Sequence, residues 1–237
     1  MRPYAGIEDV RRPGLSVTEA SPWLLRMAAT ERQLLHIAAG HMQGIPEWDV
    51  KATVARHLWE DAEHADQVFA RIDQLRAHSE HYVHALRGPL GLVLEEALRA
   101  RTTLEYLVGV YGVVKPALVA AYRRYLDTTN PLADYSTVRS LRAILAEEEA
   151  QVEWGVATIE ELGDTPEERA EAAAWREHVS AYLDAAGGVL GDSFAPVAPL
   201  PPPRSGHPFV VNPESAREER FVTTVPKRFE PRTGDEF

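Results

Sequence analysis

The stretch from Leu58 to Ala65 reads LWEDAEHA, and the stretch from Leu145 to Gly155 reads LAEEEAQVEWG. Each lies in a longer run whose apolar residues recur at helical spacing, so both runs predict amphipathic helices. Acidic residues interrupt the apolar side of each run. Asp61 falls on the buried face of the first helix and Glu148 on that of the second. Buried acids on two helices indicate a polar centre inside a helical protein.

The sequence around these two stretches predicts further helices. Ser21 followed by Pro22 has the pattern of a helix start. Thr165-Pro166-Glu167-Glu168 has the pattern of a capping box with proline at the first helical position. No alternating strand pattern is found, which disfavours a β-rich fold. The expected helices cover residues 21–43, 49–77, 92–126 with a kink at Pro116, 132–162 and 166–186.

The helices define an expected domain organisation. Residues 1–20 are expected to form an irregular lead-in, residues 21–186 a helical bundle and residues 187–237 an extended Pro-rich tail, because no helix tolerates its prolines. A disordered tail is one alternative, and the arrangement we favour is a tail that lies over its own domain or over a partner subunit. Its apolar residues available for such packing are Phe194, Phe209, Val210, Val211, Phe221, Phe229 and Phe237.

Connection lengths restrict the topology. The breaks after the first and third helices are short, so each joins an antiparallel pair. About 15 extended residues between the second and third helices can reach roughly 50 Å, whereas a 25-residue helix is only ~38 Å long. The link can therefore run the length of the molecule. We expect an all-α protein in which two antiparallel hairpins are joined by one long crossover.

Composition excludes several kinds of site. The 237 residues include no cysteine, which excludes disulfides, zinc–thiolate sites and iron–sulfur clusters. A formal net charge of −11 disfavours a nucleic-acid-binding surface. Residues 1–12 lack the apolar region of a secretory signal, and we expect no run to reach the apolar length needed to cross a bilayer. We therefore expect a cytoplasmic protein with no membrane or nucleic-acid partner.

Six polar side chains interrupt the apolar faces of four helices and are the candidate metal ligands. A buried unpaired carboxylate is costly, so it takes up a proton or finds a cation. Four carboxylates carry a charge of −4, which matches two divalent ions, and oxygen ligands with imidazole suit iron or manganese. Ion pairs with Arg101 or Lys115 are the metal-free alternative. The candidates are Glu31, Asp61, His64, Glu105, Glu148 and Gln151.

This order of residues resembles the ferritin-like diiron-carboxylate superfamily over residues 21–162. That family uses one acid on the first and third helices and a Glu-x-x-His motif on the second and fourth. Asp61 to His64 matches the second position with Asp in place of Glu, and Glu148 to Gln151 matches the fourth with Gln in place of His. Glu31 and Glu105 match the first and third positions.

The resemblance implies a ferritin-like four-helix bundle and a non-haem dinuclear centre of two iron ions, or of manganese and iron. It also implies an oxidoreductase or oxygenase that acts with dioxygen on a small organic substrate and forms a homodimer. The resemblance identifies no catalytic residue beyond the metal ligands. Two alternatives stay open: a metal-poor bundle that acts through its surface or tail, and a ferroxidase or iron-handling protein. Gln151 favours the metal-poor reading, because an amide is a neutral ligand.

Other residues have less specific interpretations. His57 lies one turn before Asp61 and is a replacement ligand, a residue that orients a ligand, or a core histidine. The series His78, His81 and His84 is expected to consist of exposed histidines near a helix end. Tyr106 and Tyr111 are expected to pack in the core.

Overall fold

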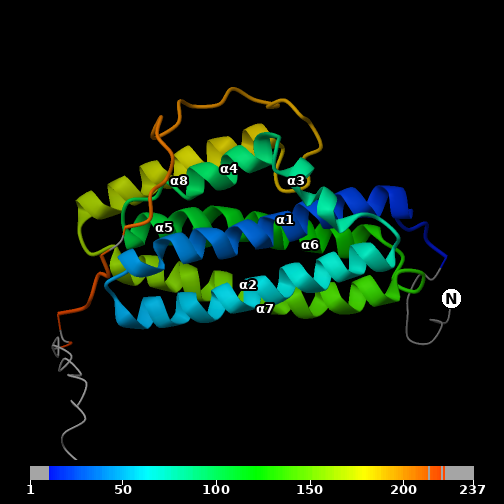
Figure 1. Cartoon of the computed structure of the whole chain (residues 1–237), viewed down its shortest axis with the longest axis horizontal. Helices are drawn as coiled ribbons and strands as arrows, with labels where there is room; N and C mark the ends of the chain where they lie inside the picture. The colour runs from blue at the N-terminus through cyan, green and yellow to red at the C-terminus, as the bar shows by residue number, and fades with distance from the viewer. Residues whose placement is uncertain (1–10, 213, 220, 222–237) are drawn as a thin grey trace, which may run out of the picture.

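The computed structural model describes residues 11–212, 214–219 and 221, and all regular structure in this part of the chain is helical. The prediction of an all-α protein is confirmed. Four long helical rods lie side by side and enclose the core (Figure 1). The rods are α1 (Val17–His41), α2 (Trp48–Gln74), α7 (Tyr135–Leu162), and a composite of α5 (Thr103–Gly109), the π-helical segment η3 (Val110–Val114) and α6 (Lys115–Thr128).

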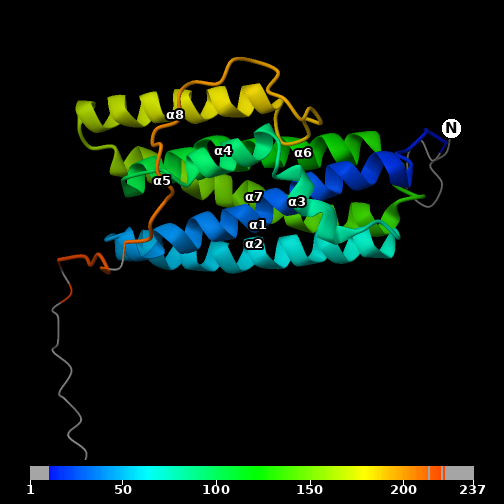
Figure 2. The same cartoon turned by 45° about the horizontal axis from the view of Figure 1, so that its top comes forward.

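The link between α2 and α5 carries short helices of its own. It contains η2 (Ser79–His81), α3 (Tyr82–Ala85) and α4 (Pro89–Ala97). The last helix, α8 (Pro166–Ala186), packs against α4 and α5, and the two helices α4 and α8 form a further layer on one side of the rods (Figure 2). The capping box predicted at Thr165 is present at the start of α8.

Helix α1 begins one turn earlier than the Ser21–Pro22 pattern predicts. Ser16 is its N-cap, and Ser16 and Glu19 form a reciprocal capping box. Pro22 lies inside the helix, and the buried Ser21 hydroxyl donates to the Val17 carbonyl. The expected lead-in over residues 1–20 therefore ends before Val17, because the Ser16 cap supplies the partners that the first N–H groups need.

The predicted single helix over residues 92–126 is also wrong in detail. The chain leaves helical geometry between α4 and α5, and Thr102 caps α5 by accepting from the Glu105 amide at 3.1 Å. The apolar residues continue across this break, so hydropathy gives no sign of it. Pro116 lies at the start of α6, directly after the π-helical turns of η3.

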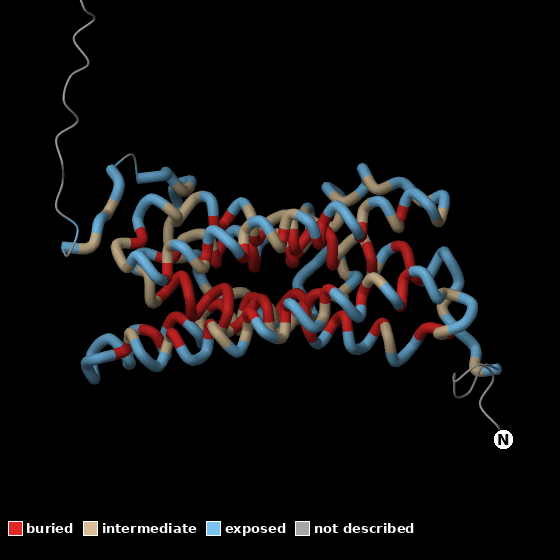
Figure 3. Tube along the Cα trace, turned by 90° about the horizontal axis from the view of Figure 1, so that it is seen from below, coloured by how far each residue is buried: buried red, intermediate tan, exposed pale blue. Residues whose placement is uncertain are grey.

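Buried residues lie along the inner sides of the rods (Figure 3). Two of the rods approach closely at Gly155 of α7, where an added Cβ would lie 2.2 Å from the Cβ of Tyr111. The helical stretch Thr103–Thr128 is long and apolar enough to cross a membrane by length and composition, contrary to the expectation from the sequence, but 72% of its most apolar window is buried in the protein. Packing in the core accounts for that composition.

The described part of the C-terminal tail lies over its own helices, which is one of the two expected arrangements (Figure 1). The Tyr182 hydroxyl donates to the Pro201 carbonyl at 3.0 Å, and the Ala216 amide donates to the Gln43 carbonyl at 2.8 Å. Of the predicted packing residues, Phe209 contacts the His41 ring and Phe221 the Trp48 ring. Phe194, Val210 and Val211 are exposed, and Phe229 and Phe237 lie outside the described residues.

Candidate metal centre

Four of the predicted ligands converge in the middle of the rods. Glu31 comes from α1, Asp61 and His64 from α2, and Glu148 from α7, and each of the four residues is at most 2% exposed. One ligand atom from each residue lies within 4.8 Å of the others. The acids that interrupt the apolar faces of three helices therefore share one buried site, and we call these four residues the acidic cluster.

Lys115 supplies a positive charge to the acidic cluster. Its Nζ donates to Asp61 Oδ1 at 2.8 Å and to the two Glu148 carboxylate oxygens at 2.9 and 3.1 Å, and the lysine is completely buried. It is the first residue of α6 and follows the π-helical segment η3, a rare geometry that is frequent at functional sites. Burial disfavours the ammonium, but Asp61 and Glu148 outweigh it and raise the pKa of Lys115, which stays charged.

The three carboxyl groups of the cluster have different environments. Burial raises the pKa of Glu31, and the neighbouring Glu148 raises it further. Burial also raises the pKa of Asp61, although Lys115 opposes this effect. Burial acts in the same direction on Glu148, but Lys115 and His64 outweigh it and lower the pKa of that group. Glu148 is thus the most firmly ionised of the three.

His64 is held from outside the cluster and faces into it. Its Nε2 lies 2.8 Å from a carboxylate oxygen of Glu147, and its Nδ1 lies 3.3 Å from Glu148 Oε1 and 3.6 Å from Glu31 Oε1. Burial opposes the imidazolium, but the interactions with Glu148 and Glu31 outweigh it and raise the pKa of His64 to about 11. The Glu147 carboxylate at Nε2 fixes the ring so that Nδ1 faces the cluster, as is common for metal-binding histidines.

Several buried polar atoms near the cluster lack a hydrogen-bond partner. Among the described residues, the buried side-chain oxygens without a partner are Glu31 Oε2 and Gln151 Oε1, and His64 Nδ1 also lacks one. The remaining unpartnered atoms are N–H groups of Arg12, Arg99 and Trp175. Leaving such a buried atom without a partner costs about 1–3 kcal/mol. All the partnerless oxygens therefore belong to predicted ligands.

Glu105 does not join the cluster, contrary to the prediction. Its carboxylate accepts two hydrogen bonds from the Arg204 guanidinium, at 2.6 and 2.7 Å, and one from the Arg101 amide at 2.7 Å. It lies in the first turn of α5, where negative charge is favourable. The pattern Thr102-x-x-Glu105 is that of a helix start, and this signal was available in the sequence. Lys115, ten residues further on, occupies the centre instead.

Gln151, the sixth predicted ligand, and His57 lie on the helices of the acidic cluster but are not among its four residues. Gln151 is buried one turn after Glu148, and its amide nitrogen donates to Glu60 Oε2 at 2.9 Å. His57 is buried too, and its Nδ1 is hydrogen-bonded to the Tyr111 hydroxyl at 2.9 Å. Burial lowers the pKa of His57 to about 3, and the charge of Lys115 adds to this effect. Of the three roles considered for His57, a neutral core histidine matches these contacts.

Two residues that contact the cluster have no signal in the sequence. Tyr122 is completely buried on α6, and its hydroxyl donates to Glu31 Oε1 at 2.7 Å. Glu147 holds His64, although helical spacing places it at the side of the apolar face. The sequence predicts Lys115 only as an ion-pair partner of the acids in a site without metal, and the structure shows it paired with Asp61 and Glu148. A pattern of apolar residues does not reveal these contacts, since they depend on how neighbouring helices are rotated.

The other residues considered for chemistry are accounted for by the fold. His78, His81 and His84 are exposed, as predicted, with neighbouring ring centroids 5.2 and 5.5 Å apart. Tyr106 and Tyr111 are buried in the core, with their rings in an edge-to-face arrangement at 6.2 Å. In the described part of the chain, the acidic cluster is the group of histidine and acidic residues with spacing suited to a metal ion.

Comparison of the chain with family models, with curated proteins and with solved structures gives no match.

Proposed function

We propose that the protein is a ferritin-like metalloprotein that holds one iron or manganese ion at the acidic cluster and oxidises a small organic substrate with dioxygen. The observation that carries the proposal is the set of unpartnered atoms. Glu31 Oε2 is a buried acceptor without a partner, and His64 Nδ1 is a buried ring nitrogen without one, in a group whose members approach within 4.8 Å. A bound cation would displace the Nδ1 proton of His64, so that this nitrogen and the carboxylates could act as ligands while Glu147 keeps the ring oriented.

The donor set suits iron or manganese. Three carboxylates and one imidazole supply hard oxygen ligands with nitrogen, as those metals prefer. A bound ion of this kind would supply redox chemistry with dioxygen. The chain itself supplies orientation and a dry site: Tyr122 holds Glu31, Glu147 holds His64, and Lys115 holds Asp61 and Glu148.

Charge favours one metal ion in place of the two that the sequence suggests. That expectation counted four carboxylates, Glu105 among them. In the structure the cluster has three, from Glu31, Asp61 and Glu148, and Lys115 contributes +1. When a metal ion displaces the protons of its ligands, the three carboxylates and the ammonium sum to −2, which matches a single divalent ion. The ammonium of Lys115 thus takes the place of a second metal.

The order of the helices supports the ferritin-like assignment. Helices α1 and α2 form a hairpin, a long link carrying α3 and α4 follows, and the composite rod packs against α7. Ligands from facing helices at mid-length are typical of that superfamily. The oxidation reaction rests on this analogy, which is weaker support than the cluster itself.

A second candidate is a metal-free helical protein in which ion pairs complete the polar core. The contacts of Lys115 with Asp61 and Glu148 favour it, because they neutralise part of the charge that a metal would otherwise balance. In this case the protein would act through its surface, and the cluster would serve to fix the packing of the helices.

Metal analysis and thermal unfolding distinguish the two candidates. We expect the full-length protein to bind about one equivalent of Fe(II) or Mn(II) per chain, and its melting temperature to rise, because a ligand of the folded state stabilises it by mass action. His64→Gln and Glu148→Gln should abolish both effects. Glu105→Gln is the matched control and should retain them, because Glu105 lies outside the cluster.

Each result has a defined meaning. If neither metal binds and the melting temperature stays constant, the metal-free candidate is supported. Two equivalents per chain would contradict the charge argument. Protein loaded anaerobically with Fe(II) should change its optical spectrum on exposure to dioxygen, and a metal-loaded protein that shows no change would refute the oxidation reaction while leaving the metal centre intact.

A further inference from the structure

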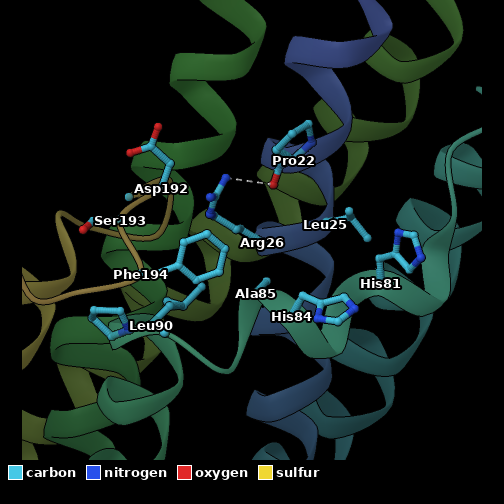
Figure 4. A pocket seen from close by; sticks show the side chains of 13 residues that line it. Pro22, Leu25, Arg26, His81, His84, Ala85, Leu90, Asp192, Ser193 and Phe194 are labelled. Atoms are coloured by element: carbon cyan, nitrogen blue, oxygen red, sulfur yellow. Dashed lines mark hydrogen bonds between the residues drawn. The ribbon is translucent and has the colours of Figure 1, made fainter.

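A separate pocket lies on another face of α1, away from the acidic cluster. It has a volume of about 230 Å³ and lies between α1, the α3–α4 segment and the start of the tail (Figure 4). Arg26 is five residues before Glu31, so the two side chains leave α1 about 140° apart. The residues that matter for binding are Leu25, Arg26, Ala85, Leu90, Asp192 and Phe194.

Arg26 is the unusual residue of this pocket. The only hydrogen bond of its guanidinium within the described structure is to the Pro22 carbonyl at 3.3 Å, and the residue is partly buried. Asp192 lines the same pocket but forms no ion pair with it in the described structure, and its carboxylate points away from the guanidinium (Figure 4). Burial lowers the pKa of Arg26, and the charge of Asp192 opposes this. A partly desolvated guanidinium with unused donors favours an anion.

The rest of the lining is mainly apolar, and it also includes the imidazoles of His81 and His84 (Figure 4). Leu25 and Leu90 come from α1 and α4, and Ala85 from α3. Phe194, from the tail, is 85% exposed, and its ring lies beside Arg26 in the pocket (Figure 4). A guanidinium beside a mainly apolar wall is suited to an amphipathic ligand, since a few polar groups fix the orientation and apolar contacts supply much of the affinity.

We propose that this pocket binds a small organic monoanion, a carboxylate with a short apolar chain. Its carboxylate lies on the Arg26 guanidinium and its apolar part lies against Leu25, Leu90 and the Phe194 ring. Asp192 selects against ligands of higher negative charge because its own carboxylate lines the same pocket. The site requires nothing from the acidic cluster, so it is independent of the proposed metal chemistry.

Isothermal titration of the full-length protein with three eight-carbon probes tests the proposal. The probes are octanoate, octanol and octylammonium, which share the apolar chain and differ in charge. We expect octanoate to bind at least tenfold more tightly than either of the others. Arg26→Gln should remove that preference, and the matched control Arg142→Gln, an exposed residue of α7, should leave it unchanged.

Two further variants keep the test decisive if Arg26→Gln does not fold. Asp192→Asn should tighten octanoate binding severalfold because it removes a repelling charge, and Phe194→Ala should weaken it severalfold. Both residues are exposed, so neither substitution should change the melting temperature. Equal binding of octanol, preferential binding of octylammonium, or unchanged octanoate affinity in Asp192→Asn would each overturn the proposal.

Discussion

Replacing Lys115 by methionine removes the ammonium group from the acidic cluster and keeps a side chain of similar length. The Nζ contacts of 2.8 and 2.9 Å each correspond to roughly 6 kcal/mol of Coulomb energy at an effective dielectric constant of ~20. Desolvation of the ions offsets most of this gain. Removing one partner of a buried pair costs about 3–5 kcal/mol, because the other charge stays buried. We expect Lys115→Met to lose that amount of unfolding free energy in the presence of EDTA.

The same substitution should strengthen metal binding. In the native protein a divalent ion at the proposed site would be repelled by the ammonium and would compete with it for oxygens of Asp61 and Glu148. Without the lysine, three carboxylates remain and their charge of −3 is free to attract the ion. Added Mn(II) should therefore raise the melting temperature of Lys115→Met by more than it raises that of the native protein, by mass action.

Urea unfolding and thermal unfolding, each with EDTA or with Mn(II), measure both effects. Lys51→Met is the matched control, because Lys51 donates to the Ala216 carbonyl at the surface, outside the cluster. If Lys115→Met is as stable as the native protein in EDTA, the ion pairs make no net contribution and the electrostatic reasoning is wrong. If Mn(II) stabilises the variant less than the native protein, lysine and metal do not compete for one site.

Three other substitutions test the packing, the tail and the buried histidine. Gly155→Ala should destabilise the protein by about 1–3 kcal/mol in urea, since its Cβ would lie 2.2 Å from that of Tyr111; a more stable variant would contradict the close approach. Arg204→Ala leaves the Glu105 carboxylate without its two guanidinium bonds, so the tail should be cleaved faster by protease and stability should fall by roughly 2–3 kcal/mol; an unchanged cleavage rate would refute this role. The pKa of His57 falls from 6.5 to about 3 on folding, so its contribution is present above pH 6.5 and is lost as the pH falls towards 3, by up to roughly 4 kcal/mol. His57→Gln should reduce this acid dependence in unfolding curves at pH 7 and pH 4, and an identical dependence in both proteins would show that another group is responsible.

The sequence by itself determined that the protein is helical, where α8 starts, and most of the polar centre. Apolar residues at helical spacing depend only on local geometry, so a carboxylate that interrupts the buried face is visible without a structure. Glu31, Asp61, His64 and Glu148 were identified in this way, and the structure brings them together. The Thr165 capping box also depends only on neighbouring residues, and the sequence predicted it. The Ser16–Glu19 capping box is of the same kind, but it was missed because the Ser21–Pro22 pattern predicts a later helix start.

Only the tertiary structure decided which charged residue of the composite rod (α5, η3 and α6) faces the acidic cluster. Glu105 and Lys115 both lie within one apolar stretch, and spacing alone does not show which faces the acids. The break before Thr102 and the π-helical turns of η3 set the rotation of that rod, so Lys115 reaches Asp61 and Glu148 while Glu105 reaches Arg204 of the tail. Such contacts join residues far apart in the chain. Their physical cause is the packing of whole helices, which no local pattern records.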